Sequence, residues 1–171
     1  MLGLAACSGD DEAMKVPAVQ DVSSLSAADR AFISEAGYSG TSEVALGRLA
    51  AERGSIQGVR AFGNAMSEQH GQVNAELADI AGRKGIIPPA APDPGQQAVA
   101  NTLSGLSGTE FDRQYLAQQM AQHQVALALF QSEASLSQDP DLKAFAAKHV
   151  PDIEQHITML RQMMPASTSA N

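Results

Sequence analysis

Residues 109–136 read TEFDRQYLAQQMAQHQVALALFQSEASL, and this stretch decides the fold class. Its apolar residues, among them Leu116, Met120 and Leu127, recur every three or four positions and share one face of an α-helix. His123 occupies a position on that same apolar face. The stretch therefore predicts a long amphipathic helix that carries an ionisable side chain among its core residues.

Three further stretches repeat this arrangement, so four predicted helices each carry an ionisable residue on the apolar face. The four faces are Phe32-Ala36-Ser39-Glu43-Leu46, Phe62-Met66-His70-Val73-Leu77, Leu116-Met120-His123-Leu127-Phe130 and Phe145-His149-Ile153-His156-Leu160. The alternation of β-branched residues that is typical of strands is nearly absent. We therefore predict an all-α fold, an up-down-up-down four-helix bundle.

Capping residues, glycines and prolines predict where each helix begins and ends. The four helices are expected from the Ser26 cap to about Arg53, from the Ser55 cap to Lys84, from the Thr109 cap to about Leu136, and from after Asp139 to about Met164. Asp29 and Asp112 stand three residues after two of these caps and predict capping boxes. A proline-rich loop over 86–95 and a short helix over 96–106 are expected to join the second and third helices. Pro151 is expected to kink the last helix.

Length and charge limit the classes of function. The chain has 171 residues, which suits one domain, and we expect the bundle to cover 26–165 with a disordered tail over 166–171. Its net charge is −8 and its basic residues are scattered, which argues against nucleic acid as a partner. Nothing in the sequence indicates a particular protein partner.

The sequence around Cys7 is typical of a bacterial lipoprotein signal. The stretch Leu4-Ala5-Ala6-Cys7 resembles a lipobox, and a polar segment over 8–25 that would serve as a tether follows it. Only six residues precede Cys7, so we expect residues 1–7 to be a truncated signal. The prediction is a periplasmic or outer-membrane-anchored protein that touches the membrane only through a lipid at Cys7. The alternative is a chance cysteine in a disordered N-terminus.

The candidate site is the set of ionisable residues on the apolar helix faces. Counted from the predicted turns at ~1.5 Å per residue, His70, His123 and His156 share one layer to within roughly 8 Å along the helix axes. Glu43 lies about one turn away, and His149 is two turns before His156 on the same face. Buried ionisable groups are costly unless they are paired, hydrogen-bonded or bound to metal.

Three histidines and a glutamate are ligand types that suit one zinc, iron, manganese or copper ion. We predict that Glu43, His70, His123 and His156 hold such an ion, with His149 as an additional candidate. Met66, Met120 and Met159 flank the three histidines, which also suits copper, or haem held by a histidine and a methionine. Methionine is equally an ordinary core residue, and no Cys-x-x-Cys-His motif for covalent haem occurs.

Four segments of the chain resemble a known family. They are Thr41–Ala50, Val59–Met66 with His70 and Asn74, Phe111–Leu116 with His123, and Leu142–Ala147 with Pro151 and His156. Across 28–164 the chain resembles an exported bacterial ferritin-like family of unknown function, some of whose members are described as outer-membrane proteins. The resemblance implies a ferritin-like bundle in the cell envelope, with no established activity. It also implies that Glu43, His70, His123 and His156 are recurring polar positions, while His149 is an extra.

The chain departs from di-iron ferritins, which carry Glu-x-x-His on two helices. Ser67, Met120 and Ile153 stand three residues before the histidines, which argues against a dinuclear centre. No motif of nucleophilic or nucleotide chemistry occurs. Our leading hypothesis is a non-enzymatic envelope protein that binds one metal ion. The alternatives are a metalloenzyme acting on oxygen or peroxide, and a purely structural protein whose histidines form a hydrogen-bonded core.

Overall fold

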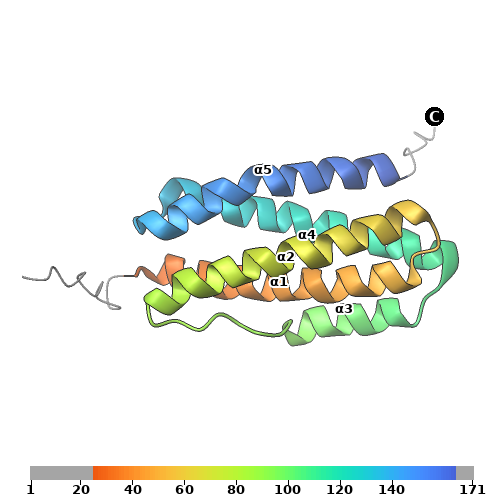
Figure 1. Ribbon diagram of the computed structural model, residues 1–171, viewed down its shortest axis with the longest axis horizontal. Coiled ribbons are helices and arrows are strands. Elements are labelled where there is room, and N and C mark those ends of the chain that lie inside the picture. Colours follow the sequence, from red (N-terminus) through yellow and green to blue (C-terminus); the bar gives the residue numbers. More distant parts are fainter. Residues whose placement is uncertain (1–24, 165–171) are drawn as a thin grey trace, which may run out of the picture.

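The computed structural model describes residues 25–164, which form five α-helices and contain no strand (Figure 1). The helices are α1 (Ala27–Arg53), α2 (Gln57–Arg83), α3 (Pro94–Ser104), α4 (Gly108–Leu136) and α5 (Pro140–Met163). The four long helices lie lengthwise beside one another, and the short α3 lies against α1 and α4. The predicted all-α class is therefore confirmed for these residues.

Local capping explains where α1 and α5 begin. The Ser26 hydroxyl accepts from the Asp29 backbone N–H, and the Asp29 carboxylate accepts from the Ser26 N–H, both at 3.0 Å. This is the predicted capping box. Asp139 caps α5 by accepting from the next two N–H groups, and Pro140 is the first helical residue. Helix α5 continues through Pro151 to Met163 without interruption.

The predicted caps of α2 and α4 are wrong. Ile56 and Ser107 occupy the cap positions, and neither has a side-chain cap. The hydroxyl and the backbone N–H of Ser55 instead donate to the Asp112 carboxylate, and the N–H of Ile56 donates to it at 3.2 Å. Because one carboxylate satisfies the turn between α1 and α2 from another helix, a tertiary contact replaces the expected local ones.

The predicted up-down-up-down order is also wrong, because α4 runs parallel to α2. Asp112, near the start of α4, bonds the turn that precedes α2. Ser137, just after α4, donates to Asp29 at the start of α1, and Lys84, just after α2, pairs with Asp139 at the start of α5. The segment 84–107, which includes α3, returns along the length of the molecule (Figure 1). It is a crossover rather than a turn, so the order is up-down-down-up.

The core consists of two apolar clusters, one toward each end of the molecule. One contains Phe32, Phe130 and Phe145, whose rings contact one another edge-on or tilted. The other contains Phe62 and Tyr115. Every position of the four predicted apolar faces is buried or half-buried, and each histidine of the predicted layer falls between residues of the two clusters. The fold thus places a polar layer in the middle of its core.

The predicted signal at Cys7, most of the predicted tether and the tail over 166–171 lie outside the described residues. Within 25–164, no helix has both the length and the apolar composition needed to span a bilayer.

Candidate metal centre

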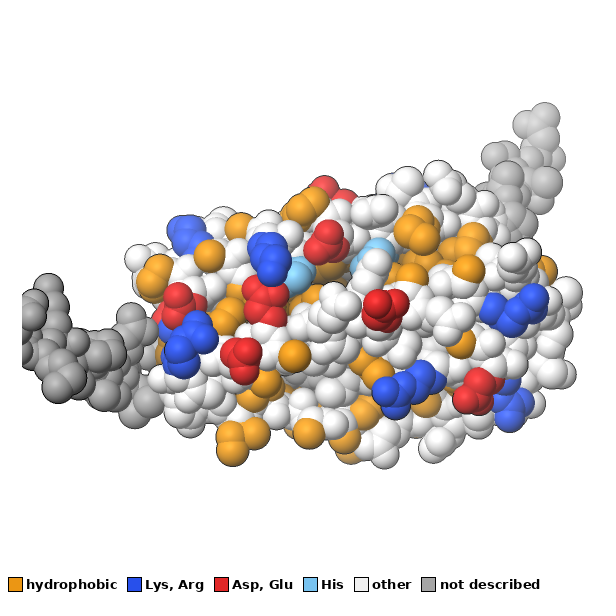
Figure 2. Space-filling view, in the orientation of Figure 1, with side chains coloured by type: hydrophobic (Ala, Val, Ile, Leu, Met, Phe, Trp, Pro, Cys, Tyr) orange, Lys and Arg blue, Asp and Glu red, His pale blue; other side chains and the backbone are white. Residues whose placement is uncertain are grey.

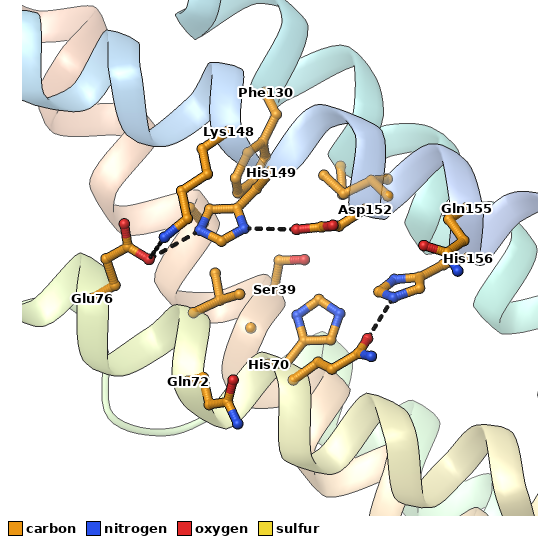
Figure 3. Close-up of a pocket in the computed structure, with 16 residues that line it drawn as sticks. Ser39, His70, Gln72, Glu76, Phe130, Lys148, His149, Asp152, Gln155 and His156 are labelled. Atoms are coloured by element: carbon orange, nitrogen blue, oxygen red, sulfur yellow. Dashed lines mark hydrogen bonds and ion pairs between the residues drawn. The ribbon is translucent and has the colours of Figure 1, made fainter.

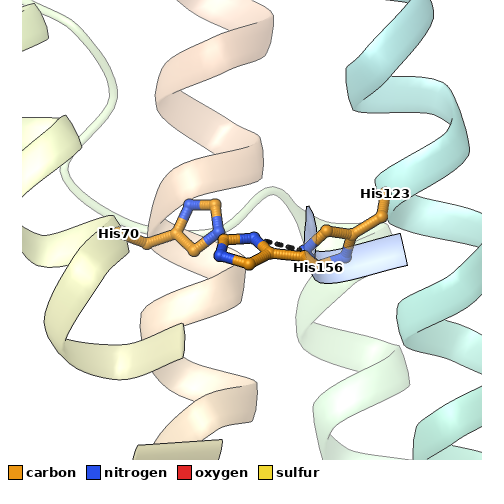
Figure 4. A group of neighbouring side chains, drawn as sticks. All are labelled: His70, His123 and His156. Carbon is orange, nitrogen blue, oxygen red and sulfur yellow. Dashed lines mark hydrogen bonds between the residues drawn. The ribbon is translucent and has the colours of Figure 1, made fainter. Parts of the chain in front are cut away.

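Three histidines from three helices converge in the middle of the bundle. His70 of α2, His123 of α4 and His156 of α5 each offer one ring nitrogen, and these nitrogens all lie within 4.8 Å of one another (Figure 4). The Nε2 of His123 and the Nδ1 of His156 are 3.3 Å apart. Ligand nitrogens of a tetrahedral zinc ion, at about 2.0–2.1 Å from the metal, are separated by roughly 3.3–3.4 Å. One pair therefore already has the spacing of metal ligands.

Hydrogen bonds on the outer side of two rings decide which nitrogens carry protons. The Nδ1 of His123 lies 2.9 Å from the backbone carbonyl oxygen of Gln119, and the Nε2 of His156 lies 2.7 Å from the Oε1 of Gln69. Carbonyl oxygens only accept, so both outer nitrogens donate, and the inner nitrogens of the neutral rings carry lone pairs. With the Gln69 amide in this orientation, the facing nitrogens of the two neutral rings, 3.3 Å apart, both carry lone pairs, a geometry that a bound cation would stabilise.

His70 supplies the third inward-facing donor. Its Nε2 is buried and has no hydrogen-bond partner among residues 25–164. Burial lowers the pKa of His70 to about 3, with a smaller contribution from the charges of His123 and His156. Burial likewise lowers the pKa of His156 to about 4. Both rings are therefore neutral near pH 7, which is the form that binds a metal ion.

Glu43, the fourth predicted ligand, lies behind His123 rather than among the three nitrogens. Its Oε1 is 3.8 Å from the Nδ1 of His123, which is the outer nitrogen of that ring. Burial raises the pKa of Glu43, and the charge of His123 opposes this rise. Its Oε2 and the buried Tyr115 hydroxyl have no hydrogen-bond partner within the described chain. The structure therefore makes Glu43 a second layer around the site.

His149 lies outside the cluster, at the charged rim of a neighbouring cavity. Its Nε2 is 3.2 Å from the Oε2 of Glu76, and its Nδ1 is 3.1 Å from the Oδ2 of Asp152 (Figure 3). Lys148 donates to the same Glu76 oxygen at 2.7 Å. The His149 ring also packs against Phe145. The structure thus separates this additional candidate from the other three histidines.

A cavity of about 320 Å³ connects the rim to the histidine cluster. His70, Gln69 and His156 line the part of the cavity beside the cluster, and Val73, Phe130 and Ile153 are among its apolar walls. In the space-filling view the surface is hollowed between two visible patches of histidine, with acidic and basic side chains beside them (Figure 2). The cluster can therefore be reached from solvent through this cavity.

Sequence reasoning missed the groups that orient the rings. Gln69 precedes His70 and is an exposed residue of α2, yet its side-chain amide contacts His156 on α5. The carbonyl of Gln119 lies one turn before His123 and has no side-chain signature. The one signal for Gln69 in the sequence is its position next to His70.

Residues 14–163 match the model of a family described as a domain of unknown function, DUF4142, and the chain belongs to this family. A search of curated proteins gave no match. Among solved structures, the chain is similar to the crystal structure of a DUF305 fragment from Deinococcus radiodurans, with 18% sequence identity and a TM-score of 0.71. The match covers 81% of this chain and 95% of that chain. At this level of identity, the likeness shows a shared helical fold alone.

Proposed function

We propose that this member of the DUF4142 family binds one transition-metal ion between His70, His123 and His156. The observation that carries the proposal is the convergence of three ring nitrogens, one from each histidine, within 4.8 Å of one another, while the outer nitrogens of His123 and His156 contact the carbonyl oxygens of Gln119 and Gln69. Neutral imidazole suits zinc, copper, iron and nickel. The ligand set contains no bridging carboxylate, so the proposed centre is mononuclear.

The surroundings of the three rings also suit a cation. Glu43 places a carboxyl group behind His123, where its negative form offsets the charge of a bound ion. Phe62 lies beside His123 and His156, with ring centroids 6.3 Å from each. This apolar neighbour limits the orientations that the two imidazoles can adopt. Both features would hold the ligands in place before an ion arrives.

We also propose that the protein is a ferritin-like bundle that is exported and anchored by a lipid. We describe the molecule as a ferritin-like bundle because one crossover joins its two helical hairpins, as in ferritin-like folds. Export and lipid anchoring rest on the lipobox around Cys7. Metabolic labelling with a radioactive fatty acid tests the anchor: the wild type should incorporate label and Cys7→Ser should not. Equal labelling of both would contradict it.

Metal titration of protein purified without a histidine tag and stripped by chelator tests the metal site. Calorimetry with Zn²⁺ and elemental analysis should give one ion per chain. Replacing His70, His123 or His156 by alanine should weaken binding about 100-fold or more, since each change removes a ligand. His149→Ala is the matched control and should bind as the wild type does. Equal, substoichiometric metal in all variants would contradict the proposal.

The alternative to a metal site is a histidine core held by hydrogen bonds alone, and it requires the opposite orientation of the Gln69 amide. If that amide donates to His156, the inner nitrogen of His156 carries the proton and donates to His123, and no ion is needed. Nitrogen-15 NMR of the metal-free protein distinguishes the two. We expect the Nδ1 of His156 to be unprotonated; a proton there would favour the hydrogen-bonded core.

A further inference from the structure

We propose that the ion in this centre keeps one coordination position open to the 320 Å³ cavity, where a small neutral donor molecule with an apolar body binds. This inference rests on the proposed metal site. With such an open position, the protein would bind a small molecule at its metal ion and not the metal ion alone.

The number of protein ligands decides whether the ion keeps an open position. The described residues bring three donor nitrogens together, and Glu43 stands at the outer nitrogen of His123. A tetrahedral ion with three protein ligands takes its fourth ligand from water or from a substrate. Sites of this composition are therefore open to exchange, whereas structural zinc sites are closed by four protein ligands.

The surroundings of the three rings determine the direction of the open position. Phe62 lies beside the rings of His123 and His156, and Glu43 lies behind His123. His70 and His156, by contrast, line the cavity (Figure 3). The cavity therefore adjoins the rings of His70 and His156, and a fourth ligand would enter from this side.

The size and lining of the cavity indicate the kind of molecule that fits it. Its size is at the lower end of the range for small-molecule sites, roughly 300–1,000 Å³. Val73, Phe130 and Ile153 offer an apolar and partly aromatic surface, and Gln72 and Gln155 add amide groups. This lining suits a compact organic body with a few polar atoms.

The rim of the cavity selects against anionic ligands. It carries two carboxylates, Glu76 and Asp152, which both contact His149, and one ammonium group, Lys148, which is already paired with Glu76. With the His149 ring neutral, the rim has a net negative charge. An anion would therefore meet unfavourable charge on entry. A neutral nitrogen heterocycle meets no such barrier, and its ring nitrogen is a suitable donor to the ion.

The test uses the protein loaded with Co²⁺, whose visible absorption reports the ligands of the ion. Azide probes the open position alone, benzimidazole probes the position together with the cavity, and benzoate is the anionic comparison. We expect azide and benzimidazole to shift the cobalt bands, with benzimidazole binding more tightly than either anion.

Filling the cavity should remove the advantage of the larger probe. Ala126 lines the cavity from α4, so Ala126→Phe should weaken benzimidazole about tenfold or more while azide still binds. Ala128→Phe, two residues further on the exposed side of the same helix, is the matched control and should leave both affinities unchanged. Circular dichroism checks folding, and the smaller Ala126→Leu replaces Ala126→Phe if that variant does not fold.

The outcomes separate this inference from the metal site itself. Absence of cobalt bands overturns both. Cobalt bands that neither azide nor benzimidazole moves show a closed centre and overturn this inference alone. Benzimidazole binding that Ala126→Phe leaves unchanged overturns the role of the cavity, and benzoate binding at least as tightly as benzimidazole overturns the preference for neutral ligands.

Discussion

Two buried polar regions of this molecule differ in how their groups are satisfied. In the end cluster, near the starts of α1 and α5, Lys84 Nζ lies 2.7 Å from the Asp139 carboxylate, and Ser137 donates to Asp29 at 2.7 Å. In the histidine layer, three ring nitrogens lie within 4.8 Å of one another, and the Nε2 of His70 has no partner within the described chain. The end cluster is Asp29, Lys84, Glu133, Ser137, Asp139 and Asp141; the histidine layer is His70, His123 and His156.

In the end cluster, Lys84 pairs with Asp139 and Asp141, and Ser137 donates to Asp29, so these groups join the helix ends without a ligand. Glu133 is the exception, because its buried Oε1 has no partner within the described chain. The histidine layer brings three ring nitrogens together without an opposite charge between them, and we propose that a metal ion completes it. Changes confined to one region should leave the other unaffected.

Metal binding should give the largest effect, and only through the histidine layer. Zn²⁺ at about 1,000 times its dissociation constant should stabilise the folded state by about 4 kcal/mol, or roughly 8–16 °C in melting temperature. Scanning calorimetry measures this increment, and chelation should reverse it. His123→Ala should lose the increment and Lys84→Met should retain it. An equal rise in the His123→Ala variant would show that the ion binds elsewhere.

Removing the central cation of the end cluster should destabilise the fold without affecting the metal. The Lys84 side chain is 4% exposed and pairs with Asp139, whose side chain is 12% exposed, so Lys84→Met leaves the Asp139 charge uncompensated and should cost about 3 kcal/mol. Urea unfolding measures this cost, and Lys143→Met, at an exposed lysine, is the control. A loss of zinc affinity in the Lys84→Met variant would contradict the independence of the two regions.

Acid should destabilise the metal-free protein through the histidine layer. The pKa of His70 is about 3 in the folded state and about 6.5 when unfolded, so its neutral ring contributes stability above pH 6.5 that is lost as pH falls. Between pH 7 and pH 5 the wild type should lose about 2 kcal/mol more than His70→Leu. Urea unfolding in chelating buffer measures the difference. Identical pH dependence in the two proteins would mean that the ring is not buried as described.

Glu133 of the end cluster should respond to pH in the opposite direction and more weakly. Burial and the charge of Asp29 raise the pKa of Glu133 to about 7, so the folded state holds a proton that the unfolded chain releases near pH 4.5. Stability from this group therefore falls as pH rises from about 4.5 to 7. Glu133→Gln should be about 1 kcal/mol more stable than the wild type at pH 8, measured by urea unfolding. A destabilised variant at pH 8 would contradict this sign.

The residues of the histidine layer could be predicted from the sequence even though the helix order could not. His70 lies 15 residues after Ser55 and 14 before Lys84, so it is at mid-height whichever way α2 and α4 pair. Counting residues from either end of α2 therefore predicts the same layer. The order itself depends on whether 84–107 turns or crosses over, and a proline-rich segment with a short helix is compatible with both.

Side-chain contacts between helices could not be predicted. The pattern that places Asp112 three residues after Thr109 is that of a capping box, yet its carboxylate bonds the turn before α2. Glu43 lies on the predicted apolar face, but its position behind His123 depends on how α1 and α4 are rotated. The cavity likewise depends on side chains from four helices, and no spacing in the sequence predicts it.

X-ray absorption at the zinc edge tests the three-histidine centre most directly. For wild-type protein with one Zn²⁺ per chain, we predict three imidazole nitrogens at about 2.0 Å and one further light atom, with the outer-shell scattering of imidazole rings. Changing His70 to alanine should reduce the imidazole count by one. A first shell of carboxylate or water oxygens, or one that contains sulfur, would contradict the account.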